Sequence, residues 1–244
     1  MPDPLFTDPR LASIYDVLDG PRTDLGAYVA IVDELNGQSV LDLGCGTGSF
    51  ACLLAGRGVE VVGVEPAVAS LDLARGKPGA DDIRWIHGDA TAVPDDVAVH
   101  VATMTGNVAQ VFTTDDDWTT TLDELGAHVQ PGGWLVFETR VPSARAWERW
   151  TSEQTLRTLS VPDVGRVTTW IDLIDVAEPY VSFRHTFRFE ATGTKITSES
   201  TLRFRDTDEL TTTLNAAGFE VRDIRDAPDR PGLELVVLAQ RAST

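Results

Sequence analysis

Short apolar runs alternate with amphipathic stretches through residues 40–140 of the chain. The runs are bounded by glycine or polar residues and comprise Val40–Leu43, Glu60–Glu65, Ile83–His87, Val97–Met104 and Trp134–Thr139. Such runs are typical of strands that are buried on both faces. The segments between them have helical periodicity, as in Thr47–Arg57 and Trp118–Val129. Strands joined by helices predict right-handed crossovers and a doubly wound parallel sheet, so the fold class is α/β.

Two helical stripes precede the first apolar run. Their apolar positions recur every three or four residues, at Leu11, Ile14, Tyr15 and Leu18 and then at Leu25, Tyr28, Val29, Val32 and Leu35. Gly20-Pro21 ends the first stripe and Asn36-Gly37 ends the second. We therefore expect residues 1–36 to form an N-terminal helical segment.

The segment 141–206 is much longer than a simple strand-to-helix connection needs. It opens with a short helix expected at Pro142–Trp150. Three stretches of alternating polarity follow and predict an antiparallel β-meander: Arg166–Val176, Tyr180–Glu190 and Thr194–Arg205. In the middle stretch, His185 shares a face with Phe183 and Phe187, whereas Arg184 and Arg188 face the other way.

The α/β pattern then resumes. Asp206 starts a helix, and Phe219–Ile224 and Leu233–Gln240 read as the last two strands. We expect one domain overall, in which a core of residues 37–140 and 207–244 carries the N-terminal helical lid and an inserted cap at 141–206.

A glycine turn follows the first strand, with the sequence Asp42-Leu43-Gly44-Cys45-Gly46-Thr47-Gly48. Glycines here let the backbone turn sharply and approach a ligand closely. A dinucleotide fingerprint would place its third glycine one residue later, where Ser49 stands. Asp42 suits a cationic or amino-bearing ligand better than a pyrophosphate. Glu65 ends the second strand 21 residues after Gly44, at the position where an acid accepts hydrogen bonds from ribose hydroxyls.

With this motif the chain resembles class I S-adenosylmethionine (SAM)-dependent methyltransferases. The resemblance implies a Rossmann-like, seven-stranded, mostly parallel sheet whose last strand is antiparallel. It also implies SAM as cofactor and S-adenosylhomocysteine as product. Members of the family with a helical lid and a three-stranded insertion, the glycine- and sugar-amine-type N-methyltransferases, resemble the chain in outline over nearly its full length.

The resemblance and the strand ends together select the residues expected to bind the cofactor. The turn and ribose positions are Asp42, Gly44, Cys45, Gly46, Thr47 and Glu65. Asp89 and Ala90 would hold the adenine, on which Pro66 packs, and Met104 and Thr105 end the fourth strand. Tyr15, in a Tyr-Asp pair of the lid, would reach the methionine end. Two alternatives remain open: Asp89 can be a turn residue and Tyr15 a core residue.

Methyl transfer from a sulfonium needs orientation of the acceptor rather than a metal or a covalent nucleophile. Asn107 and Gln110 follow the fourth strand, where the transferring methyl group should lie. We therefore expect Asn107, Gln110 and Tyr15 to be the catalytic residues. The competing interpretation is that the amides of Asn107 and Gln110 only cap the loop. For His185 two roles are also open, that of a general base and that of a structural residue of the cap.

The composition of the chain disfavours several classes of binding partner. The chain has 20 basic and 38 acidic residues, for a net charge of −18, which disfavours nucleic acid and anionic membranes as partners. The two cysteines and four scattered histidines suggest neither a disulfide framework nor a metal site. With no recognisable signal peptide or membrane span, we expect a cytoplasmic monomer or homodimer.

The sequence leaves three functions open. The first is a methyltransferase acting on nitrogen or oxygen of a small molecule, which a lid and cap of this size would enclose. The second is a methyltransferase acting on RNA or protein, and the third is a SAM-binding protein that transfers no methyl group.

Overall fold

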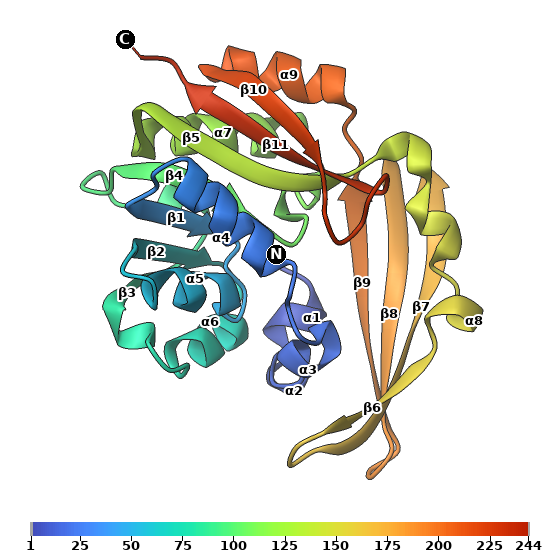
Figure 1. The fold of residues 1–244 in the computed structure, drawn as a ribbon. Helices are drawn as coiled ribbons and strands as arrows, with labels where there is room; N and C mark the ends of the chain where they lie inside the picture. The colour runs from blue at the N-terminus through green and yellow to red at the C-terminus, as the bar shows by residue number, and fades with distance from the viewer. Residues whose placement is uncertain (1, 244) are drawn as a thin grey trace.

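The computed structural model describes residues 2–243, and within them a seven-stranded sheet forms the centre of the molecule (Figure 1). Its strands in chain order are β1 (Ser39–Leu43), β2 (Glu60–Glu65), β3 (Ile83–His87), β4 (Val99–Met104), β5 (Val129–Arg140), β10 (Phe219–Asp226) and β11 (Glu234–Arg241). Their order across the sheet is β10-β11-β5-β4-β1-β2-β3. All the strands predicted for the core are therefore present in one sheet.

Strand direction follows the expected pattern. Strands β3, β2, β1, β4 and β5 are mutually parallel, and β11 runs antiparallel to both β5 and β10. The predicted fold class is confirmed. Because β2 lies on one side of β1 and β4 on the other, the strand order reverses between β1 and β4. Ligands of such sheets bind at this reversal, beyond the carboxyl ends of the strands.

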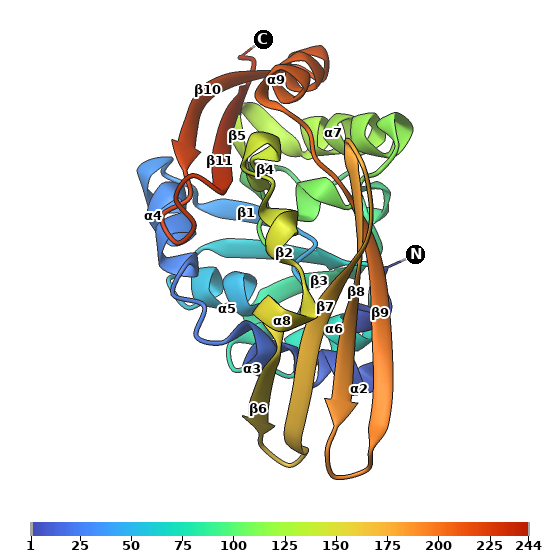
Figure 2. The same cartoon turned by 90° about the vertical axis from the view of Figure 1, so that its right-hand side faces the viewer.

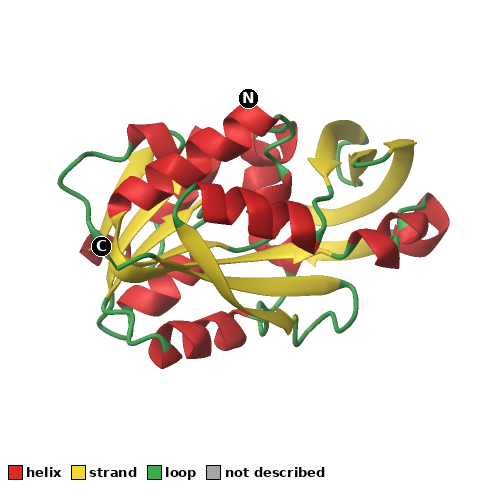
Figure 3. Ribbon diagram, turned by 90° about the horizontal axis from the view of Figure 1, so that it is seen from above, coloured by secondary structure: helices red, strands yellow, loops and turns green. Residues whose placement is uncertain are grey.

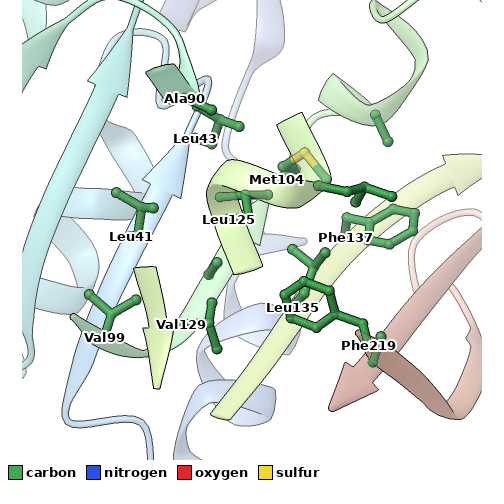
Figure 4. Close-up of a cluster of buried hydrophobic side chains, with 14 of the residues drawn as sticks. Leu41, Leu43, Ala90, Val99, Met104, Leu125, Val129, Leu135, Phe137 and Phe219 are labelled. Atoms are coloured by element: carbon green, nitrogen blue, oxygen red, sulfur yellow. The ribbon is translucent and has the colours of Figure 1, made fainter. Parts of the chain in front are cut away.

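Helices cover both faces of the sheet (Figure 3). On one face, α4 (Leu25–Glu34) and α5 (Ser49–Ala55) pack on the strands, and α6 (Val68–Arg75) contacts β2 and β3. On the other, α7 (Asp115–His128) and α9 (Thr207–Ala216) bury the larger apolar cluster. Its strand side chains include Leu41, Met104 and Phe137 (Figure 4).

The cap is a separate antiparallel sheet of order β6-β7-β8-β9. Three of its strands are those predicted, β7 (Gly165–Ala177), β8 (Tyr180–Phe189) and β9 (Thr194–Arg203), and β6 (Arg157–Val161) is an additional edge strand. The sequence did not indicate β6 because it is only five residues long and carries just two apolar side chains, Leu159 and Val161, too few for a clear alternation. The helix expected at Pro142–Trp150 is replaced by 3-10 turns at Pro142–Ala144 and Ala146–Arg149, followed by α8 (Ser152–Thr155).

The first three helices of the chain lie between the core and the cap (Figures 1 and 2). The first predicted stripe is divided into α2 (Pro9–Ala12) and α3 (Tyr15–Asp19), preceded by α1 (Pro4–Thr7). Both α1 and α2 contact α6, and the apolar side chains of this segment pack on the cap as one cluster: Leu11, Ile14 and Leu18 with Val161, Val167 and Phe187. The proposed division into lid, core and cap stays a prediction. Over residues 2–243, no helix is both long enough and apolar enough to cross a membrane.

Candidate functional site

The glycine turn bends sharply between β1 and α5. Gly44, Gly46 and Gly48 have φ values of +72°, +55° and +77°, a region that side chains rarely adopt. The N–H groups of Gly44 and Cys45 both donate to the Val64 carbonyl, at 2.8 and 3.0 Å. A Cβ at Gly44 would lie 2.6 Å from Val108, so another side chain would collide with the loop after β4. The turn is therefore fixed against the ends of both neighbouring strands.

Glu65 lies against this turn, as the register of β1 and β2 requires. Its carboxylate accepts hydrogen bonds from the N–H of Gly46 at 2.9 Å and of Ala67 at 2.8 Å. The side chain is buried, and burial raises the pKa of its carboxyl group. The two halves of the sequence motif thus meet at one point, with Pro66 exposed immediately beyond it.

Asp42 is buried at the carboxyl end of β1, with 1% of its surface exposed. Oδ1 accepts a hydrogen bond from the Thr103 hydroxyl at 2.9 Å, but Oδ2 has no partner among the described residues. Burial raises the pKa of this carboxyl to about 7. A buried carboxylate oxygen without a donor is costly in free energy, so this atom is suited to a ligand that brings one.

The lid is attached to the glycine turn through the residue after Tyr15. Asp16 accepts a hydrogen bond from the Thr47 hydroxyl and forms an ion pair with Lys77 at 2.7 Å. Lys77 also donates to Ser49 at 2.8 Å. Tyr15 itself is half-buried, and burial raises the pKa of its phenol. The lid helix and the turn are therefore held together by polar contacts.

Arg22 stands where the lid meets the core. Its guanidinium pairs with Asp19 and Asp24, each at 2.8 Å. Its charge also acts to lower the pKa values of both Tyr15 and Asp42, against the larger effect of burial. The charge of Arg22 therefore favours the ionised form of Asp42.

The residues expected to bind adenine and those at the end of β4 differ in their exposure. Asp89 is exposed, and its side chain accepts hydrogen bonds from the N–H and hydroxyl of Thr91 at 3.0 and 2.6 Å, the turn role left open above. Ala90 is buried, Thr105 is half-buried, and Met104 lies in the core beside Phe137 (Figure 4). Their roles toward a cofactor stay predictions.

Asn107 and Gln110 are both buried, and protein atoms surround them. Asn107 has a left-handed backbone, with φ of +62°. The Gln110 amide uses both ends, accepting from Arg140 at 2.8 Å and donating to the Arg203 carbonyl at 3.5 Å. Gln110 thereby links the core to the cap. This structural role resembles the competing interpretation, in which the amide caps neighbouring backbone groups. Contact of either residue with an acceptor stays a prediction.

Two buried acids, Glu138 on β5 and Glu234 on β11, were not identified from the sequence. They are 5% and 2% exposed, and both contact the loop after β4. The sequence did contain a signal for Glu138, which is an acid within an otherwise apolar strand. Such an acid needs a buried hydrogen-bond partner. Tyr28 of α4 is one such partner and donates its hydroxyl to Glu138.

His185 lies on the apolar face of the cap. It exchanges a hydrogen bond with the Thr169 hydroxyl at 2.6 Å, and its ring centroid is 4.1 Å from that of Phe187. Arg184 and Arg188 are on the opposite, exposed face and pair with Glu199 and Glu190. Over residues 2–243, no group of three or more metal-ligating side chains occurs.

Residues 40–133 match the model of a family described as a methyltransferase domain. The chain carries a methyltransferase domain. A Streptomyces protein named cypemycin N-terminal methyltransferase is 32% identical over 136 residues, which are 54% of this chain and 56% of that protein. A demethylmenaquinone methyltransferase from Clavibacter sepedonicus is 31% identical over 112 residues, 45% of this chain and 44% of that one. The chain thus spans about half the length of these curated relatives.

Solved structures confirm the class I methyltransferase fold over almost the whole chain. The CcbJ methyltransferase from Streptomyces caelestis has a TM-score of 0.75 at 24% identity and covers 93% of this chain and 92% of its own. The SAM-bound amino pentose methyltransferase CalS10 from Micromonospora echinaspora has a TM-score of 0.72 at 20% identity, covering 91% and 92%.

The matched methyltransferase domain includes Asp42, Glu65, Asn107 and Gln110 but ends before β5 is complete. Glu138 and Glu234 therefore lie outside it. The polar groups beyond β4 are assembled from the domain and from the segments that follow it.

Proposed function

We propose that the chain transfers a methyl group from SAM to a nitrogen or oxygen atom of a small-molecule acceptor. One observation carries the proposal: the partnerless Oδ2 of buried Asp42 and the carboxylate of Glu65 lie at adjacent strand ends beside the glycine turn. This arrangement offers acceptors to a ligand with an amino group and vicinal hydroxyls.

The residues present fit SAM. Each Glu65 oxygen accepts one backbone N–H and keeps a lone pair for a ribose hydroxyl. Asp42 Oδ2 can accept from the ammonium group of the methionine end, and the positive charge of that group favours the ionised carboxylate. We assign Arg22 as a cation for the methionine carboxylate and Tyr15 to the same end of the ligand. We assign the adenine to Asp89 and Ala90, as the resemblance implies.

Bound SAM supplies a methyl group that its sulfonium charge already activates. The contribution of the chain is then to hold the acceptor in line with that methyl group and to keep water out. Asn107 and Gln110 follow the strand next to Asp42, and the cap strand β9 contacts the same loop through the Arg203 carbonyl. We assign orientation of the acceptor to this loop.

A small acceptor is favoured by the net charge of −18 and by a site between lid, core and cap. CalS10, an amino pentose methyltransferase, has this fold. A peptide or protein acceptor is the second candidate, favoured by the similarity to cypemycin N-terminal methyltransferase. A cytoplasmic location, the state of monomer or homodimer and the absence of nucleic-acid partners remain predictions.

Two measurements test the function. Calorimetry should show SAM binding, and a library of small amines and alcohols should contain acceptors that release S-adenosylhomocysteine. A peptide library run in parallel distinguishes the second candidate. Tight SAM binding without turnover in either library would instead favour a SAM-binding protein that transfers no methyl group.

A further inference from the structure

A cluster of polar residues lies where the carboxyl end of β5 meets the start of β11 and the loop after β4; Tyr28, Asn107, Glu138 and Glu234 are its buried members. We call it the β5–β11 polar cluster, and its members are Tyr28, Asn107, Glu138, Arg140, Arg230 and Glu234. The antiparallel register of β5 and β11 pairs Arg140 with Glu234. The cluster joins the loop after β4, which we assign to the acceptor, to the last strand of the sheet.

The hydrogen-bond donors of this cluster that face its acids are already engaged. Glu138 accepts from the backbone N–H groups of Gly106 and Asn107 on one oxygen and from Tyr28 on the other. Oε1 of Glu234 accepts from Arg230 at 2.7 Å and from the Asn107 amide at 3.1 Å. Arg140 Nε lies 3.4 Å from the same oxygen.

Two acceptor atoms are left over. Oε2 of Glu234 and Oδ1 of Asn107 are buried and have no hydrogen-bond partner among the described residues. They belong to two side chains that already contact each other, so one small group can reach both. Since both atoms only accept, the group that completes them must donate. An N–H-bearing nitrogen has this property.

We propose that Glu234 is a further catalytic residue, whose free Oε2 binds an N–H of the acceptor nitrogen together with Oδ1 of Asn107. This inference rests on the proposed function. As the nitrogen lone pair forms the new N–C bond, the C–S bond breaks and its electron pair stays on sulfur. The nitrogen becomes positively charged, and its proton later leaves to water. A carboxylate fixed beside that nitrogen stabilises the charge as it develops.

The two arginines of the cluster leave Oε2 of Glu234 without a partner. Both approach Oε1, and together they balance the formal charges of Glu138 and Glu234. The formal charges of these two acids and two arginines therefore sum to zero before the reaction, and Oε2 of Glu234 is the carboxylate oxygen that still lacks a donor. This arrangement favours a transition state in which positive charge appears on the acceptor.

The test uses Glu234→Gln and Asn107→Gly, the second of which keeps the left-handed backbone. Glu220→Gln on β10 is the matched control, because Glu220 is an exposed acid paired with Arg222. Amines and their alcohol counterparts serve as acceptor probes, and kcat, KM, SAM affinity and thermal stability are measured for each variant. We expect kcat with amines to fall at least 30-fold in Glu234→Gln, with SAM affinity within threefold of the parent.

Three results would overturn the inference. They are parental kcat in Glu234→Gln, a parallel loss of SAM affinity, or turnover of alcohols as fast as of the matched amines. If Glu234→Gln does not fold, Glu234→Asp retracts the carboxylate by one methylene and should still lower kcat about tenfold; parental kcat there also refutes it. A parent that binds SAM but methylates nothing would refute the proposed function itself, and the inference with it.

Discussion

Replacing Glu65 should weaken SAM binding. The ribose would lose two charge-assisted hydrogen bonds, each contributing roughly 1.5–3 kcal/mol. Water recovers part of this, so a net loss of at least about 2 kcal/mol is expected, which is roughly 30-fold in affinity. Glu65→Ala removes both bonds, but it also leaves the N–H groups of Gly46 and Ala67 without their acceptor.

Glu65→Gln separates the two effects, because it keeps the side-chain volume and one acceptor oxygen while removing the charge. Glu60 begins the same strand and is exposed, so Glu60→Gln is the matched control. Titration calorimetry with SAM measures affinity, and thermal melts without SAM verify folding. We expect at least a 30-fold loss for Glu65→Ala, a smaller loss for Glu65→Gln and none for Glu60→Gln. Unchanged affinity in a folded Glu65→Ala protein would refute the cofactor assignment.

Other predictions concern pH, the cap, the loop and the surface. Because burial raises the pKa of Asp42 to about 7, its ionisation opposes folding as pH rises from about 4 to 7. Asp42→Asn should therefore raise the melting temperature at pH 8 while weakening SAM binding; a lower melting temperature would contradict this. Burial lowers the pKa of His185 to about 4, so its contribution is complete above pH 6.5 and lost as pH falls toward 4. His185→Ala should lower the melting temperature more than turnover, and an equally stable but inactive variant would instead make it catalytic. Gln110→Ala should lower kcat/KM for the acceptor at least tenfold, with SAM affinity within a few-fold, and intact turnover would move the search for the acceptor site to the cap. In filter binding at ~0.15 M salt the protein should not retain tRNA, and submicromolar, salt-dependent retention would favour an RNA substrate.

The glycine turn and its acid could be predicted because both depend on short spacings along the chain. The apolar runs defined the core strands, and β2 and β3 have the predicted bounds. Once β1 and β2 are parallel neighbours, the register brings Glu65 to the turn at Gly46. Local pattern and strand direction were therefore enough to predict this part of the site.

The sequence did not reveal what depends on contacts between distant segments. The edge strand β6 has only two apolar positions in five residues, which is too short a pattern to indicate a strand, and its pairing with β7 defines it. From the sequence, the Gln110 amide was predicted to contact the methyl acceptor. In the structure it is hydrogen-bonded to Arg140 and to the Arg203 carbonyl of the cap strand β9.

The acids Glu138 and Glu234 are 96 positions apart in the sequence, and only the antiparallel pairing of β5 with β11 brings them together. A short sequence pattern reports spacing along the chain, whereas burial and the pairing of charges depend on which segments pack against each other. The tertiary structure therefore decided which polar atoms are satisfied within the protein and which are left for a ligand.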